Sequence, residues 1–275
     1  MRSTNMCHSL AETPAARGCP QPPRARGAGF GYPGQVTDAL SYHPEAPGTT
    51  AQALPGTFLA LEGGDGGGKS TQARLLAQRL EAAGADVVLT REPGGTALGE
   101  RIRELLLDPA HGEMDARAEA LLYAAARAAH ARQTIRPALA LGAVVICDRY
   151  LDSSAAYQGA GRGLGEQTIT DLSRWATREL LPDLTLFLQV PDDDARARLA
   201  ARGAAPDRLE AEPDAFRSRT AAAFRALAAR GGSRQAVDGR GEVAEVAARI
   251  DAVIGEHLPR LGALLTDGTA PEARA

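Results

Sequence analysis

The chain has 275 residues, of which 44% are hydrophobic and 24% are charged, and its formal net charge is -3 at pH 7. This composition is typical of a globular protein with a hydrophobic core, and the small negative charge argues against nucleic-acid binding, which usually goes with a basic excess. The three cysteines, Cys7, Cys19 and Cys147, fit neither a disulfide framework nor a zinc site. No apolar run reaches the roughly 18 residues that a membrane span needs. We therefore expect a cytoplasmic protein that binds neither nucleic acid nor membrane.

The two ends of the chain differ in composition from its middle. Residues 1–56 are rich in Pro, Gly, Ala and Thr and show no helical or strand periodicity, which predicts a disordered extension. Residues 57–262 are predicted to form one domain, and residues 263–275 a flexible tail.

Within that domain, short apolar runs alternate with longer stretches of helical periodicity. The predicted strands are Phe58–Glu62, Asp86–Thr90, Ala143–Cys147, Leu184–Val190 and Arg234–Val237. The predicted helices are Gln72–Ala83, Ala97–Leu107, Arg117–Leu141, Glu166–Leu180, Asp192–Arg202, Asp214–Arg230 and Val243–Leu258. Strands this apolar are typical of a parallel sheet covered by helices on both faces, so we expect a doubly wound α/β fold with five parallel strands.

A glycine-rich motif lies between the first strand and the first helix. It runs Gly63-Gly64-Asp65-Gly66-Gly67-Gly68-Lys69-Ser70 and satisfies the G-x-x-x-x-G-K-[ST] pattern of a P-loop. We expect Lys69 to lie along the β- and γ-phosphates of a nucleotide and Ser70 to reach Mg²⁺, with Thr71 beside them. The motif predicts a P-loop NTPase or nucleotide kinase fold, yet ATPases, GTPases, partition proteins and small-molecule kinases all share it.

Two charged residues directly follow the third predicted strand. Asp148 and Arg149 should therefore emerge at the carboxyl edge of the sheet, where α/β folds bind their ligands. Arg149 offers two parallel donors to phosphate oxygens, and Asp148 can orient a metal-bound water or Arg149. The alternative is that the two side chains simply pair and cap the strand.

The stretch from Ser153 to Gly165 contains glycines at spacings that suit a lid. Arg162, carried by such a lid, could reach the migrating phosphoryl group while the lid excludes water. A glycine-rich loop with one arginine is also common in a solvated linker, and only its position after Arg149 favours a lid.

Two further clusters could line an acceptor pocket. The loop Arg91-Glu92-Pro93-Gly94-Gly95-Thr96 has a restricted shape, and we keep open that Glu92-Pro93 is a cis bond. Tyr123 and Arg127 lie one helical turn apart, so that they share a helix face. The first cluster could equally be an ordinary turn, and the second a partly buried tyrosine beside a surface arginine.

Together these segments resemble the thymidylate kinases. The resemblance runs from about Thr57 to Ile250 and rests on the strings LEGGDGGGKSTQ, TREPGGT, LLYAAARAAH, CDRYLDSSAAYQGAGRGLG, PDLTLFLQV and PDRLE. It implies transfer of the γ-phosphoryl group of ATP to dTMP with Mg²⁺ as cofactor, and it implies a homodimer.

The resemblance also assigns roles to single residues. It implies that Lys69, Arg149 and Arg162 are catalytic and that Ser70 and Asp148 serve the metal. It places Asp65 near the 3′-hydroxyl of the acceptor and Arg91, Arg127 and Arg149 around its phosphate, with Tyr123 stacked on thymine, Ser154 at the base edge and Tyr157 at the 2′ position.

Gly66 stands where one type of thymidylate kinase has a catalytic arginine, so the chain resembles the bacterial type whose arginine comes from the lid. The sequence departs from the family pattern at three places. Ala125 and Ala126 stand where an acidic residue is sometimes found and Ser154 replaces a Thr or Asn, which bears on how the base is read, and the extension before residue 57 lies outside the pattern. Alternatives are a P-loop kinase for another deoxynucleotide or nucleoside, a P-loop ATPase switch and a non-catalytic binding module.

Overall fold

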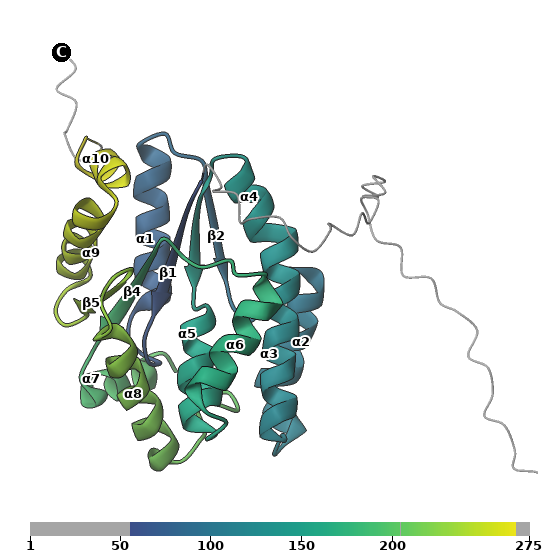
Figure 1. The fold of residues 1–275 in the computed structure, drawn as a ribbon. Helices are drawn as coiled ribbons and strands as arrows, with labels where there is room; N and C mark the ends of the chain where they lie inside the picture. The colour runs from purple at the N-terminus through teal and green to yellow at the C-terminus, as the bar shows by residue number, and fades with distance from the viewer. Residues whose placement is uncertain (1–55, 204, 268–275) are drawn as a thin grey trace, which may run out of the picture. The chain divides into compact units, whose positions relative to one another are not determined.

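The computed structural model describes residues 56–203 and 205–267, so the predicted extension lies outside the described residues except for Gly56. A five-stranded parallel sheet in the order β2-β3-β1-β4-β5 forms its centre (Figure 1). The strands are β1 Thr57–Glu62, β2 Val87–Arg91, β3 Val144–Asp148, β4 Leu184–Gln189 and β5 Arg234–Asp238. All five predicted strands are confirmed, as is the P-loop nucleotide kinase fold class.

Helices cover both faces of the sheet (Figure 1). The helices are α1 Lys69–Ala82, α2 Ala97–Leu107, α3 Ala116–His130, α4 Arg136–Ala140, α5 Leu151–Ser154, α6 Glu166–Thr177, α7 Asp192–Ala201, α8 Asp214–Ala228, α9 Val243–His257 and α10 Pro259–Asp267. Among the described residues, none of these helices is long and apolar enough to cross a membrane.

The two faces of the sheet have separate cores because successive side chains of a strand point to opposite sides. Leu59 and Leu61 of β1 pack with α1, α9 and α10, whereas Phe58 and Ala60 pack with the segment from α3 to α4. Phe187 of β4 joins a third cluster that contains residues of α2, α3 and α8. The strands are therefore buried on both sides, as their apolar sequences predict.

The register of the sheet brings the functional segments together. Asp148, at the end of β3, lies opposite Leu61 of β1 and opposite Arg91 of β2. The loops that follow these three parallel strands consequently leave the sheet at the same edge, which is where the predicted site residues lie.

The predicted helix Arg117–Leu141 is interrupted in the structure. Helix α3 ends at His130, a π-helical segment spans Ala131–Ile135, and α4 begins at Arg136. Pro137 has no N–H to donate and its ring crowds the preceding turn, so the helix widens just before it.

The glycine-rich stretch predicted to be a flexible lid is mostly a buried helix. Helix α5 continues into a π-helical segment, Ala155–Gly161, and most of these residues are buried. A Cβ on Gly159 would lie 2.9 Å from the Cα of Glu166, and one on Gly161 would lie 2.6 Å from the Phe216 ring. These glycines permit close packing, so residues 155–161 form a packed helix in this structure where a loop was predicted.

The predicted flexible tail also begins too early. Helix α10 runs to Asp267, and Leu261 and Leu265 are buried against the α1 and α9 face of the sheet. The apolar residues of this short helix complete the core, so order extends past residue 262.

Candidate functional site

The phosphate cradle follows β1 directly and ends where α1 begins. Gly66 and Gly68 have φ angles of 76° and 87°, which side chains rarely tolerate, so the glycines allow the turn. Lys69 is buried and its Nζ donates to the carbonyl of Gly64 at 2.7 Å. Burial and the nearby positive charge of Arg149 lower the pKa of Lys69 to about 8. Bound phosphates, being negatively charged, would raise this pKa again and keep the amine protonated.

Arg149 lies against the cradle in a strained backbone conformation with φ 71°. Its guanidinium donates to the carbonyl of Gly63 at 3.0 Å, to Ser153 Oγ at 3.1 Å and to Asp65 Oδ1 at 2.5 Å. These three partners, two from the cradle and one from the segment after β3, hold the side chain while its backbone stays strained. Such strain at a site usually accompanies a functional requirement.

Buried Glu62 braces the loop that carries Arg149. Its Oε1 accepts from the backbone N–H groups of Tyr150 at 2.8 Å and Ser153 at 3.0 Å, and its Oε2 accepts from Ser153 Oγ at 2.6 Å. Burial, followed by the negative charge of Asp152, raises the pKa of Glu62 to about 7. The sequence analysis assigned no role to this residue.

Asp65 is held at the centre of the site. The hydroxyl of Tyr157 donates to its Oδ2 at 2.5 Å, while Arg149 contacts its other oxygen. Burial acts to raise the pKa of the Asp65 carboxyl, but the charges of Arg149 and Lys69 outweigh it and lower that pKa. Asp65 thus presents a carboxylate to the space beside the cradle.

Asp148 and Ser70 meet near Lys69. Ser70 Oγ donates to Asp148 Oδ2, and Asp148 Oδ1 is buried with no hydrogen-bond partner among the described residues. A hydroxyl and a carboxylate with a free oxygen are the ligand types that Mg²⁺ accepts. Elsewhere in the described residues no cluster of three or more His, Cys, Asp or Glu side chains could hold a metal ion.

One cavity of about 570 Å³ collects most of the predicted site residues. It is lined by Asp65, Gly66, Gly68, Lys69, Ser70, Thr71, Arg91, Tyr123, Arg127, Asp148, Arg149, Ser154 and Tyr157. The structure therefore brings together residues from the cradle, the β2 loop, α3 and the β3 loop, which are far apart in the sequence. The Glu92-Pro93 bond in the β2 loop is cis.

Arg127 lies in this cavity beside Ser154 and is almost fully buried. Its NH2 donates to Ser154 Oγ at 3.0 Å and to the carbonyl of Tyr150 at 3.2 Å, its NH1 donates to Ser173 Oγ at 2.8 Å, and its Nε to Glu92 at 2.7 Å. Arg91 is exposed and paired with Glu100 at 2.8 Å. Arg127 is thus placed with the predicted base contact.

Arg162 lies outside the residues that line this cavity. Its guanidinium pairs with Glu119 at 3.0 Å and with Glu212 at 2.6 Å, and it lies over the ring of Phe216 at 4.7 Å. Glu119 is fully buried and also pairs with Arg208 at 2.6 Å. In this structure Arg162 is therefore held by two carboxylates and does not line the cavity that Lys69 lines.

Several cavity residues were missed by the sequence analysis. They include Arg103 and Gln158, and also Arg198 and Arg202 on or next to α7. Helix α7 buries none of its side chains, a property that the absence of an apolar stripe in DDDARARLAA could have indicated. Arg198 donates to the carbonyl of Gly239 at 3.0 Å and lies near Gly68 of the cradle.

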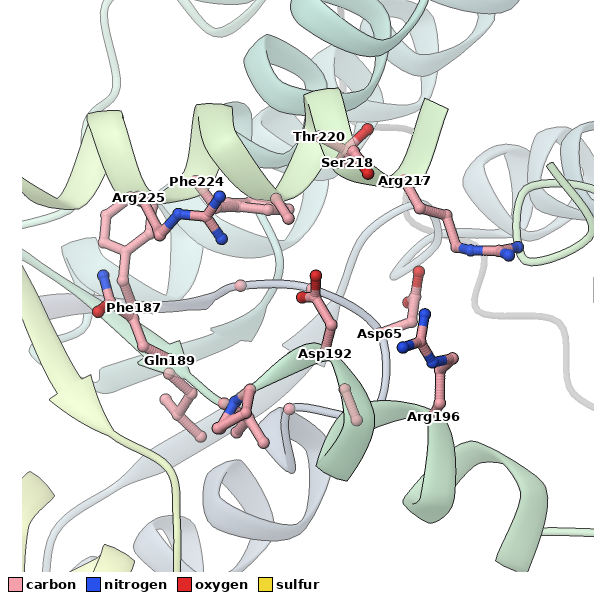
Figure 2. A pocket seen from close by; sticks show the side chains of 18 of the residues that line it. Asp65, Phe187, Gln189, Asp192, Arg196, Arg217, Ser218, Thr220, Phe224 and Arg225 are labelled. Carbon is pink, nitrogen blue, oxygen red and sulfur yellow. The ribbon is translucent and has the colours of Figure 1, made fainter. Parts of the chain in front are cut away.

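A second cavity of about 670 Å³ lies between α7 and α8 and shares Asp65 and Tyr157 with the first. Figure 2 shows this cavity, with one end formed by Phe187 and Phe224 and with charged side chains of both helices facing its interior. Residues of α7 therefore line both cavities, and none of its side chains is buried.

Comparison with known proteins gives a consistent result. A family model described as "Thymidylate kinase" matches residues 61–250. A thymidylate kinase from Leifsonia xyli is 54% identical over 196 residues, covering 71% of this chain and 93% of that protein. One from Rhizorhabdus wittichii is 50% identical over 208 residues, covering 75% and 100%. The crystal structure of thymidylate kinase from Ehrlichia chaffeensis is 32% identical with a TM-score of 0.60, covering 72% of this chain and 98% of that one.

Proposed function

Because the chain belongs to the thymidylate kinase family, we propose the following roles for its residues in the reaction of that family. The protein is a nucleoside monophosphate kinase that transfers the γ-phosphoryl group of ATP to dTMP, giving dTDP and ADP. One observation carries the assignment of residues: Lys69, Asp148 and Arg149 line the same cavity as Tyr123 and Arg127. We take the functional domain to begin at residue 57 and to include α10.

The cradle and its neighbours are proposed to hold ATP. Backbone N–H groups of Gly63 to Gly68 and the N-terminus of α1 surround the phosphates, and Lys69 neutralises their charge. Ser70 and Asp148 are proposed to hold Mg²⁺, for which the free Asp148 oxygen supplies a ligand or a contact to a bound water. When bound, the ion would draw charge from the β- and γ-phosphates.

Phosphoryl transfer itself needs no covalent intermediate. Positioning of the two nucleotides end to end and stabilisation of the migrating charge account for the catalysis. Arg149 lies between the cradle carbonyl of Gly63 and Asp65, so it can contact the phosphates of both nucleotides as charge moves between them. Asp65 is proposed to orient the acceptor through its 3′-hydroxyl.

The acceptor is proposed to lie across Tyr123, with its phosphate at Arg149 and Arg91. We assign Arg127 to the base end, since its NH2 donates to Ser154, the predicted contact to the base. Guanidinium and hydroxyl donors suit a base that presents a carbonyl oxygen, such as thymine. Tyr157, held by Asp65, would occupy the space of a ribose 2′-hydroxyl.

The mobile positive charge expected from Arg162 is proposed to come from α7. Arg198 lines the cavity beside Gly68 and Lys69. Because α7 buries no side chain, it can shift toward a bound nucleotide at little cost in packing. Arg162, with two ion pairs to break, would have to give up buried contacts to do the same.

We further propose that the enzyme acts in the cytoplasm as a homodimer, as the family resemblance implies. The exposed leucines Leu98 and Leu105 of α2 and Leu121 of α3 give neighbouring helices an apolar outer surface that a second copy could cover. Sedimentation of the purified protein over a concentration series tests this state, and a monomer at micromolar concentration would reject it.

ADP release from ATP and Mg²⁺ tests the reaction and its acceptor. We expect dTMP to support the highest kcat/KM in a panel with dUMP, dCMP, dAMP, dGMP and thymidine. Equal rates across the panel, or slow hydrolysis that dTMP leaves unchanged, would reject the acceptor assignment.

A further inference from the structure

A chain of buried hydrogen bonds leads from the end of β2 to Arg127. Thr90 Oγ1 lies 2.8 Å from His130 Nε2, His130 Nδ1 lies 2.9 Å from Glu92 Oε1, and Glu92 Oε2 accepts from Arg127 Nε at 2.7 Å. His130 is fully buried, and Glu92 and Arg127 are nearly so. The proposed chemistry assigns no role to His130.

The two oxygens of Glu92 have different tasks in this chain. One holds Arg127 and the other accepts from His130, so a rotation of the carboxylate breaks both hydrogen bonds. Glu92 is also the one carboxylate paired with Arg127 within the described residues. The direction of the Arg127 guanidinium therefore depends on how the Glu92 carboxylate is held.

His130 is itself fixed from two sides. Its Nδ1 must donate, because a carboxylate oxygen accepts, and Thr90 holds the other ring nitrogen. The ring fills a space that exists only because residue 95 is glycine: a Cβ there would lie 2.5 Å from Nε2 and 2.8 Å from Thr90 Oγ1. A side chain so constrained has one orientation.

We propose that His130 is a positioning residue for the acceptor: acting through Glu92, it fixes the guanidinium of Arg127 beside Ser154. The inference rests on the proposed role of Arg127 at the base end of the acceptor. His130 touches neither nucleotide, and a misdirected guanidinium weakens acceptor binding while the phosphate cradle stays intact.

Two amide variants separate this role from simple space filling. The amide nitrogen of His130→Asn takes the place of Nδ1 and can still donate to Glu92, whereas the amide of His130→Gln reaches the place of Nε2 and serves Thr90. We expect His130→Gln to raise the KM for dTMP by about tenfold or more, with the KM for ATP within about twofold. His130→Asn should stay within about threefold of the parent KM for dTMP.

A second pair of variants keeps the test valid if the ring position tolerates no change. Thr90→Val removes the hydroxyl that holds His130, and Thr90→Ser keeps it. We expect only Thr90→Val to raise the KM for dTMP, by about threefold to tenfold, with thermal unfolding recorded for each variant. Equal effects within both pairs, or a KM for ATP that rises as much as that for dTMP, would overturn the positioning role.

Arg127→Lys separates failure of this inference from failure of the acceptor assignment. If Arg127→Lys leaves the KM for dTMP unchanged, the assignment of Arg127 to the acceptor is wrong. If Arg127→Lys raises that KM while His130→Gln does not, only the role of His130 is wrong. If both roles are right, both substitutions act through the same guanidinium. Adding His130→Gln to Arg127→Lys should then raise the KM for dTMP by less than a further factor of about two.

Discussion

The loop at the end of β3 and helix α7 both supply arginines to the same cavity, yet they are built in opposite ways. Arg149 is held by partners from the cradle and the β3 loop, and the backbone around it is braced by buried Glu62. Helix α7 buries none of its side chains, and its Arg198 donates to the carbonyl of Gly239. We propose that the rigid side holds the charges that must be in place before binding, and that the loosely packed helix carries the charge that arrives later.

The largest effect should come from the rigid side. Arg149→Ala removes the guanidinium that contacts Asp65 and the cradle, and we expect turnover to fall by a factor on the order of 10³. Steady-state kinetics with ATP and dTMP measure the loss. Arg174→Ala is the matched control, since Arg174 is a surface arginine of α6 paired with Glu179. A loss of less than tenfold in Arg149→Ala would remove it from the reaction.

Arg198 and Arg162 are the two candidates for the mobile positive charge, and their substitutions should have opposite effects. We expect Arg198→Ala to lower turnover ten- to hundredfold without changing thermal stability, because α7 contributes little packing. Arg162→Ala should do the reverse, since it leaves buried Glu119 with fewer partners and costs about 1–3 kcal/mol of unfolding free energy. Kinetics and thermal unfolding of both variants test this. A lid role for Arg162 requires the opposite result.

A smaller effect is expected where the two regions touch. A Cβ on Gly66 would collide with the carbonyl of Ala195 in the first turn of α7, whereas a Cβ on Gly64 would meet open space. Gly66→Ala adds this collision to a side chain at a φ of 76°, so we expect it to displace α7 and lower kcat/KM for ATP about tenfold, with a smaller loss in Gly64→Ala. Equal losses in the two variants would show that α7 does not depend on this contact.

Some features of this structure follow from local sequence patterns, and others depend on tertiary contacts. The strands and the cradle were predictable because apolar runs and the P-loop pattern have one structural meaning in this order. The glycines of the presumed lid do not, because a glycine that permits motion and one that permits close packing look alike: Gly161 is packed against Phe216. Whether an arginine lies free or paired, as Arg162 does with Glu119, depends on tertiary contacts that its neighbours in sequence do not encode.

The site shows the same division. The contacts of Arg149 follow from its place after β3, and the sheet register brings Asp148 beside β1 and β2. The role of Glu62 and the chain from His130 to Arg127 required coordinates, since buried polar groups acquire their meaning from partners far away in the sequence. Helix α7 was predicted as a helix, but its absence of an apolar face was not used.

The brace on the rigid side should make the stability of the fold depend on pH. Burial raises the pKa of Glu62 from 4.5 to about 7, so between these values the folded protein binds a proton that the unfolded chain has lost. Stability should consequently fall as pH rises from about 5 to 7 and then level off. The full difference in unfolding free energy corresponds to about 3 kcal/mol at most.

Glu62→Gln keeps the acceptor for Tyr150 and Ser153 but cannot titrate, so its unfolding free energy should lack this decline. Denaturant unfolding at intervals between pH 5 and 8.5 compares the two proteins. Parallel curves would mean that Glu62 is charged in the folded state throughout, and that the rigid side holds a carboxylate as its brace.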